Sequence, residues 1–248
     1  NDLDLLPIDM GGTHKAMLLG NTDAKYNHYI YTPSGYNNNS TSYPLLVFLH
    51  GSGEIGNADT NTEALNKVIT HGPPKLIELK QWSPKYPMIV ASPQLTFGIW
   101  KPEDIHSFIS YLIKNYNINT KRIYITGVSL GGYGCFTYVS QYASDSYAAA
   151  IVPIAGGGYP NTGDRFKTTP VWAFHGDNDN AVPLRESIDI INDINRENPE
   201  NRAKLTIYPD VGHDSWTRTY DSSGMGDESK NYDPFDMSIY DWMFLFEK

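Results

Sequence analysis

A pentapeptide centred on a serine is the feature of this sequence best suited to chemistry. Residues 127–131 read Gly-Val-Ser-Leu-Gly, follow the apolar run 123–126 and precede a segment that can form a helix. In a sharp strand-to-helix turn, flanking glycines permit close packing and the serine hydroxyl stands at the helix N-terminus, where developing negative charge is favoured. This context predicts that Ser129 is a nucleophile, although the pentapeptide alone also occurs by chance.

A nucleophilic serine requires a histidine base. Of the seven histidines, only His175 and His213 follow Ser129, and strand–turn–helix hydrolases have the chain order serine, acid, histidine. His213 follows a glycine in a loop beyond the last predicted strand, so we predict that it is the base; the alternative is a surface loop histidine. We interpret His175 as a packing and hydrogen-bonding residue, because the acids between it and Ser129 lie away from predicted strand ends.

The acid that orients the base is expected just after the predicted strand 171–174. Asp179 is our choice and Asp177 is the alternative. The same stretch resembles the start of a calcium loop, but Val182 stands where that loop needs glycine and Ile188 where it needs a bidentate glutamate. We therefore predict no metal site and no cofactor.

An acyl-transfer enzyme also needs N–H donors for the oxyanion. The loop after the apolar run 45–49 reads His-Gly-Ser-Gly-Glu, and its glycines let the backbone turn toward a ligand. The predicted donors are the backbone N–H groups of Ser52 and Leu130, Leu130 being the residue after the nucleophile. A plain glycine-rich turn is the alternative, and we interpret Glu54 as fixing this loop.

Three further residues are candidates for substrate binding. Trp100 and Trp216 are predicted pocket walls, and Gln94 is a predicted polar contact to the substrate. Core packing is the alternative for both tryptophans, because tryptophans are highly buried on average. Cys135 is the single cysteine and is interpreted as a buried packing residue.

The elements that must position these residues alternate in type. Short runs that are apolar on both faces predict strands of a mostly parallel sheet, at residues 28–31, 45–49, 87–91, 123–126, 149–152, 171–174 and 205–208. Helical spacing of apolar residues predicts helices over 102–116, 184–194 and 236–246. This alternation predicts the α/β class, with a doubly wound sheet flanked by helices. Ligands bind such sheets at the carboxyl ends of the strands; a closed β/α barrel is the alternative.

Composition limits the partners and the organisation of the chain. The 19 Lys and Arg against 28 Asp and Glu give a net charge of −9, which excludes nucleic acid as an expected partner. No apolar run reaches the length of a membrane span. Two polar stretches, 36–42 and 219–233, are not flanked by a change in composition, so residues 1–248 are predicted to form a single domain.

The cellular compartment is only weakly indicated. The first residues are polar and acidic, no signal peptide is visible, and the chain begins without methionine. A single cysteine does not decide the redox environment. We expect a secreted or periplasmic location in preference to the cytoplasm.

Together these segments resemble the α/β-hydrolase superfamily, and especially its small capless esterases. The similarity is to phospholipase/carboxylesterases and to feruloyl and acetyl-xylan esterases, including sequences described as predicted peptidases. The matching segments follow the expected order along nearly the whole chain: His50-Gly51-Ser52-Gly53-Glu54, Ser92-Pro93-Gln94, residues 127–131, His175-Gly176 with Asp179 and Val182-Pro183, and Gly212-His213 with Trp216.

The resemblance implies Asp179, not Asp177, as the acid of the triad. Relatives with dienelactone-type chemistry have cysteine where this chain has Ser129. No inserted cap is evident between residues 151 and 170, which favours an open cleft for bulky or polymeric substrates. We expect residues 156–158 and the stretch 219–233 to shape that cleft instead.

The sequence therefore predicts a serine hydrolase that cleaves carboxylic esters through an acyl-enzyme. The expected substrate is a small-molecule or polysaccharide-linked ester, including carbohydrate-linked acetyl or feruloyl esters. The alternatives are a thioesterase or peptidase on the same fold, and a catalytically silent hydrolase-like protein that binds a ligand. The oligomeric state is left open.

Overall fold

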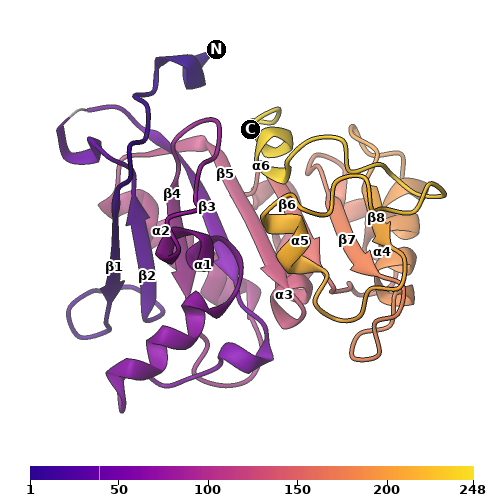
Figure 1. Ribbon diagram of the computed structural model, residues 1–248, viewed down its shortest axis with the longest axis horizontal. Helices are drawn as coiled ribbons and strands as arrows, with labels where there is room; N and C mark the ends of the chain where they lie inside the picture. Colours follow the sequence, from indigo (N-terminus) through magenta and orange to yellow (C-terminus); the bar gives the residue numbers. More distant parts are fainter. Residues whose placement is uncertain (39) are drawn as a thin grey trace.

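One eight-stranded sheet organises the chain. The computed structural model describes residues 1–38 and 40–248, and its strands follow the order β1-β2-β4-β3-β5-β6-β7-β8 (Figure 1). The first two strands pair antiparallel, β1 at Thr13–Met17 and β2 at His28–Thr32. The other six run parallel: β3 (Tyr43–Leu49), β4 (Ile89–Pro93), β5 (Ile118–Val128), β6 (Ala150–Ile154), β7 (Trp172–Gly176) and β8 (Lys204–Tyr208). The predicted mostly parallel α/β sheet is confirmed. Because the sheet has two edges, β1 and β8, the closed barrel is excluded.

All seven predicted strands overlap an observed strand, whereas β1 was not predicted. Thr13–Met17 is largely exposed and contains no run of apolar residues. It lies on the edge of the sheet, where only one neighbour, β2, pairs with it. An edge strand of this kind does not need the apolar pattern on which the prediction depended.

Helices cover both faces of the sheet. The helices α2 (Pro102–Asn115), α3 (Leu130–Tyr142) and α4 (Arg185–Arg196) pack on one face, and α1 (Gly72–Glu78), α5 (Trp216–Tyr220) and α6 (Ile239–Met243) pack on the other. The second set lies in front of the sheet in Figure 1. Alternate residues of one strand serve the two layers: Leu45 and Val47 belong to the first core, and Leu46 and Phe48 to the second. Each parallel strand is therefore buried on both sides.

Two of the three predicted helices match observed helices over most of their length, and the third matches only in part. The helices predicted over 102–116 and 184–194 are confirmed as α2 and α4, while the one predicted over 236–246 is helical only at Ile239–Met243. The chain leaves the helix there, and the carbonyls of Phe244 and Phe246 accept hydrogen bonds from the Arg122 guanidinium. The short helices α1 and α5 were not predicted; α1 contains two consecutive prolines, Pro73 and Pro74, which obscure a helical pattern.

The two polar stretches of the sequence, 36–42 and 219–233, contain a 3-10 turn and hydrogen bonds to a strand, respectively. Residues 36–38 form a 3-10 turn, and residue 39 of the predicted loop lies outside the described residues. The stretch 219–233 runs beside β8, where the N–H of Ser229 donates to Ile207 (2.7 Å) and that of Asp233 to Leu205 (2.9 Å). It thus covers a sheet edge, the part of a sheet most open to unwanted pairing. The expected role of this stretch in shaping the cleft stays a prediction.

The segment between β6 and β7 contains no inserted cap. The described chain there consists of a loop and a 3-10 turn, Gly163–Phe166. Cys135 is fully buried in α3, as predicted, and burial raises the pKa of its thiol. Within the described residues, no helix combines the length and the apolar character needed to cross a membrane.

Arg122, near the start of β5, ties the two ends of the chain together. Its guanidinium donates to the Asp2 carboxylate at 2.7 and 2.8 Å and to the carbonyls of Phe244 (3.1 Å) and Phe246 (3.3 Å). It also lies 3.0 Å from the Glu247 carboxylate. The hydrogen bond to Asp2 raises the pKa of Arg122, so the cation persists at any working pH.

We predict that Arg122→Leu destabilises the fold. The substitution removes the guanidinium donor from two carbonyls and releases Asp2, at an expected cost of about 2 to 3 kcal/mol in the free energy of unfolding. The Phe246 carbonyl keeps the Tyr124 hydroxyl as a donor (2.9 Å). Urea denaturation followed by circular dichroism measures this cost. Lys121→Ala, at the exposed neighbouring position, is the control and should change stability by less than about 0.5 kcal/mol. Equal stability of the two variants would contradict the assigned role of Arg122.

Candidate active site

Ser129 occupies a strained turn between β5 and α3. Its backbone has φ 53° and ψ −114°, a conformation that costs a side-chain-bearing residue about 1 to 3 kcal/mol. The turn holds because its N–H donates to the carbonyl of Ile154 (2.9 Å) on the neighbouring strand. Such strain is typical of functional positions. Here the turn places the serine side chain at the carboxyl edge of the sheet.

The glycines around Ser129 are required by close backbone contacts. A Cβ on Gly131 would lie 1.8 Å from the carbonyl oxygen of Leu49, and one on Gly127 would lie 2.4 Å from the carbonyl oxygen of Gly131. Both distances are far below van der Waals contact. The predicted reason for the glycines, close approach of strand and helix, therefore holds in the structure, and the partner is the end of β3.

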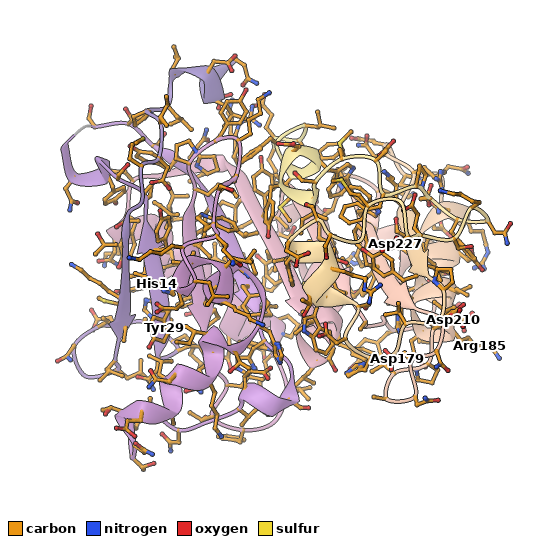
Figure 2. All side chains as sticks on the ribbon, in the orientation of Figure 1. His14, Tyr29, Asp179, Arg185, Asp210 and Asp227 are labelled. Carbon is orange, nitrogen blue, oxygen red and sulfur yellow. The ribbon has the colours of Figure 1, made fainter. Side chains whose placement is uncertain are left out.

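Ser129, His213 and Asp179 come together although they are far apart in sequence. Nε2 of His213 lies 2.9 Å from Oγ of Ser129, and Nδ1 lies 2.8 Å from Oδ2 of Asp179. An ionised carboxylate only accepts, so Nδ1 carries a proton and Nε2 of the neutral ring can accept the serine proton. Figure 2 labels Asp179 at the end of the molecule toward which the β5 and β7 arrows of Figure 1 point. The loops after β5, β7 and β8 thus supply one residue each.

The Asp179 carboxylate is buried but well supplied with donors. Its Oδ1 accepts from the N–H groups of Ala181 and Val182, both at 2.9 Å. Burial raises its pKa, but the hydrogen bonds from His213 and the two amides outweigh burial and hold the pKa below its usual value. The alternative acid, Asp177, is exposed and accepts from the N–H of Asp210 (2.7 Å). The structure therefore joins Asp179, and not Asp177, to the histidine.

His175 lies behind Asp179. Its Nε2 is 2.9 Å from the carbonyl oxygen of Val182 and 3.3 Å from Oδ2 of Asp179, and its Nδ1 is 2.8 Å from the hydroxyl of Ser187. Burial lowers the pKa of His175. The ring is thus fully engaged in holding the loop after β7, in agreement with the interpretation of His175 as a hydrogen-bonding residue.

The loop after β3 is rigidly held beside Ser129. The N–H of Leu95 donates to Nε2 of His50 (2.9 Å), so the ring proton is on Nδ1, which donates to the carbonyl of Gly51 (2.6 Å). Burial lowers the pKa of His50 to about 4, which keeps the ring neutral. The N–H of Gly51 donates to Oε2 of Glu54 (2.9 Å). The N–H and the carbonyl of Gly51 are therefore both held by hydrogen bonds.

The predicted oxyanion donors each lie at the start of a short helical segment or helix. Ser52 is the exposed first residue of the 3-10 turn Ser52–Glu54, and Leu130 is the half-buried first residue of α3. The first N–H groups of a helix have no acceptor within it and remain available to a ligand. A Cβ on Gly51 would lie 3.5 Å from the Cβ of Ser129, so the loop carrying Ser52 is in contact with the serine.

The three predicted substrate-binding residues are all buried. The amide of Gln94 donates to the carbonyls of Glu54 (2.9 Å) and Ala64 (2.7 Å), and the indole of Trp100 donates to the carbonyl of His50 (3.0 Å). Both side chains thus hold carbonyl groups of the loop after β3, and their role in binding a substrate stays a prediction. Trp216 is 8% exposed and meets the His213 ring edge to face, with centroids 5.1 Å apart. It packs beside the histidine.

Sequence reasoning did not find the supporting roles of His50 and His71. The sequence placed His50 in the loop motif, but the hydrogen bond from Leu95 that fixes its tautomer joins residues 45 positions apart. His71 lies outside every motif and contacts Trp216. Within residues 1–38 and 40–248, no three His, Cys, Asp or Glu side chains form a group that could hold a metal ion.

The sequence is similar to a known protein family and to a named esterase. Residues 94–234 match the model of the dienelactone hydrolase family. A bifunctional acetylxylan esterase/xylanase of Neocallimastix patriciarum is 30% identical over 161 residues, which are 64% of this chain. The chain spans only 22% of the length of that relative.

Solved structures share the fold. A thermostable esterase superposes with a TM-score of 0.69 and 25% identity, over 97% of this chain and 64% of that one. A ferulic acid esterase gives a TM-score of 0.58 and 14% identity, over 88% of this chain and 96% of that one. At the identity of the second, the likeness concerns the fold alone.

We predict that Gly131→Ala prevents the turn from forming. The new Cβ would overlap the Leu49 carbonyl, and relieving the overlap requires the elbow to separate from β3, at a cost of more than about 3 kcal/mol. Thermal unfolding measures the loss. Gly53→Ala is the matched control, because a Cβ at that exposed glycine meets nothing within 4 Å. A Gly131→Ala protein as stable as the control would contradict the close contact.

Proposed function

This chain belongs to the dienelactone hydrolase family, and we propose that it is a serine esterase. Ser129 is the proposed nucleophile, His213 the base and Asp179 the acid that orients it. The observation that carries this proposal is the continuous line of hydrogen bonds from Ser129 Oγ through the His213 ring to Asp179, with distances of 2.9 and 2.8 Å. This is the arrangement that acyl transfer through an acyl-enzyme requires.

In the first proposed step, Oγ of Ser129 bonds to the carbonyl carbon of the ester while its proton passes to Nε2 of His213. Asp179 stabilises the imidazolium that forms and does not take the proton itself. The carbonyl oxygen becomes an oxyanion, which the N–H groups of Ser52 and Leu130 bind. The C–O bond to the alcohol then breaks, and His213 protonates the leaving oxygen.

The second step releases the acid. A water molecule attacks the acyl carbon as His213 takes one of its protons, and the same two N–H groups bind the second oxyanion. The bond to Ser129 then breaks, and its oxygen recovers the proton from His213. The products are a carboxylic acid and the free serine, ready for another cycle.

The proposed substrate is a small-molecule or carbohydrate-linked ester, with an acetyl or feruloyl acyl group. Two observations support an open site: the His213 side chain is 29% exposed, and no cap is inserted between β6 and β7. The name of a similar protein, a bifunctional acetylxylan esterase/xylanase, supports a carbohydrate-linked acetyl ester. Such substrates would suit a secreted or periplasmic protein.

We expect a fluorophosphonate probe to label Ser129 and short acyl esters to be hydrolysed. Ser129→Ala should lose the label and lower kcat by at least about 10⁴-fold, because the nucleophile is removed while the fold remains. Comparing acetyl, butyryl, longer acyl and feruloyl esters, alone and on xylan fragments, identifies the acyl group. Thioester and peptide substrates in the same assay separate the alternatives. A wild-type protein that turns over no ester and leaves Ser129 unlabelled would contradict the esterase proposal.

Asp179→Asn should lower kcat by about 10⁴-fold, because an amide in place of the carboxylate favours the wrong tautomer of His213. Asp177→Asn is the matched control two residues away. Asp177 accepts only from a backbone N–H, so its amide variant should keep activity within about threefold. Steady-state kinetics on p-nitrophenyl acetate compare the two. A loss in Asp177→Asn with activity retained in Asp179→Asn would show that the acid has been assigned to the wrong aspartate, and equal losses would contradict the assignment to Asp179 alone.

A further inference from the structure

Glu54 is a buried acid at the end of the loop that carries Ser52, called the oxyanion loop below (residues 50–54). It is 7% exposed, and the proposed reaction gives it no chemical step. One carboxylate oxygen, Oε2, accepts from the N–H of Gly51 (2.9 Å), and the other, Oε1, lies 3.6 Å from Nε2 of His71. Burial raises the pKa of the Glu54 carboxyl, while the nearby His71 ring and the hydrogen bond from Gly51 act against that rise.

Gly51 lies between Glu54 and the nucleophile. A Cβ at Gly51 would be 3.3 Å from Oε2 of Glu54 and 3.5 Å from the Cβ of Ser129. The Gly51 N–H is held by Glu54 and its carbonyl by His50. The Gly51 carbonyl and the N–H of Ser52 belong to one planar peptide group, so the direction of that donor depends on how Gly51 is held on both sides, by Glu54 and by His50.

His71 connects this loop to the loop that carries the base. Its ring meets Trp216 edge to face with centroids 5.3 Å apart, and Trp216 meets the His213 ring in the same manner at 5.1 Å. His71 lies between the 3-10 helix Thr62–Thr70 and α1, so it belongs to neither active-site loop. The contacts therefore form a line from Glu54 through His71 and Trp216 to His213.

We propose that Glu54 and His71 are positioning residues for the ester hydrolysis proposed above. Glu54 holds Gly51 so that the N–H of Ser52 is directed at the oxyanion. His71 fixes the position of the oxyanion loop relative to His213. The inference rests on the proposed esterase activity. Its physical basis is that an oxyanion hole stabilises the transition state only when its donors are oriented before the charge develops.

The test compares what each substitution at Glu54 leaves behind. Glu54→Gln keeps an oxygen that can accept from Gly51, whereas Glu54→Ala and the bulkier Glu54→Met keep none. We expect kcat to fall about tenfold to a hundredfold in the Ala and Met variants, with KM nearly unchanged, and to fall less than about threefold in the Gln variant. Glu63→Gln, at an exposed acid of the adjacent 3-10 helix, is the control and should match the wild type.

A second readout separates positioning from a loss of packing. A boronic acid forms a tetrahedral adduct with the serine, and its oxygen occupies the oxyanion hole. Its inhibition constant should weaken in the Ala and Met variants in proportion to kcat/KM, as expected for a transition-state mimic. His71→Phe keeps a ring against Trp216 but removes the nitrogen beside Glu54, and should lower kcat by a few fold.

The outcomes distinguish this inference from the esterase proposal. Wild-type activity in folded Glu54→Ala or Glu54→Met overturns the inference, and so does an equal loss in the Gln and Met variants. If the Ala variant does not fold, the Met variant decides. A wild-type protein without esterase activity overturns the proposed function instead.

Discussion

The site depends on a contact between two stretches of backbone with no side chain between them. The helix that begins after Ser129 approaches the end of β3 so closely that Gly131 has no room for a Cβ beside the Leu49 carbonyl. This contact places the turn of β5 against the loop that follows β3. Because β3 and β5 are neighbours in the sheet, the sheet itself brings together the proposed nucleophile and the proposed oxyanion donors. The left-handed backbone at Ser129 is the strain that accompanies this proximity.

Near that contact, the carboxylate of Asp179 is stabilised by hydrogen bonds from protein groups. Asp179 has little access to water, but it receives hydrogen bonds from two backbone amides and from His213. These donors replace the water that burial removes, so the carboxylate stays ionised and can stabilise a positive imidazole. His175 occupies the far side of the same carboxylate. The loop after β7 therefore holds the Asp179 carboxylate in a fixed position.

The sequence predicted the central parts of this molecule well and its periphery poorly, for a physical reason. Buried parallel strands and the turn at Ser129 have local requirements, continuous apolar residues and glycines, that are visible in a short window. Asp179 was the preferred acid from the start, but Asp177 stayed an alternative until the family resemblance was considered, because both follow the same strand and their orientations depend on the tertiary fold. The roles of Gln94 and Trp100 required knowledge of which carbonyls they reach. Strand β1 and helix α1 left no periodic signal because one is an exposed edge and the other is short.

The contacts of Arg122 with both ends of the chain determine where another module could be attached. Asp2 and Phe246 both contact one guanidinium, so the two ends of the chain are neighbours, as Figure 1 also shows. Arg122 and Ser129 lie seven positions apart on or just after β5, which is about 20 Å along an extended strand. An attached domain, surface anchor or affinity tag would therefore leave the molecule at the end of the sheet remote from the serine. A large polymer could approach the serine without meeting such an attachment.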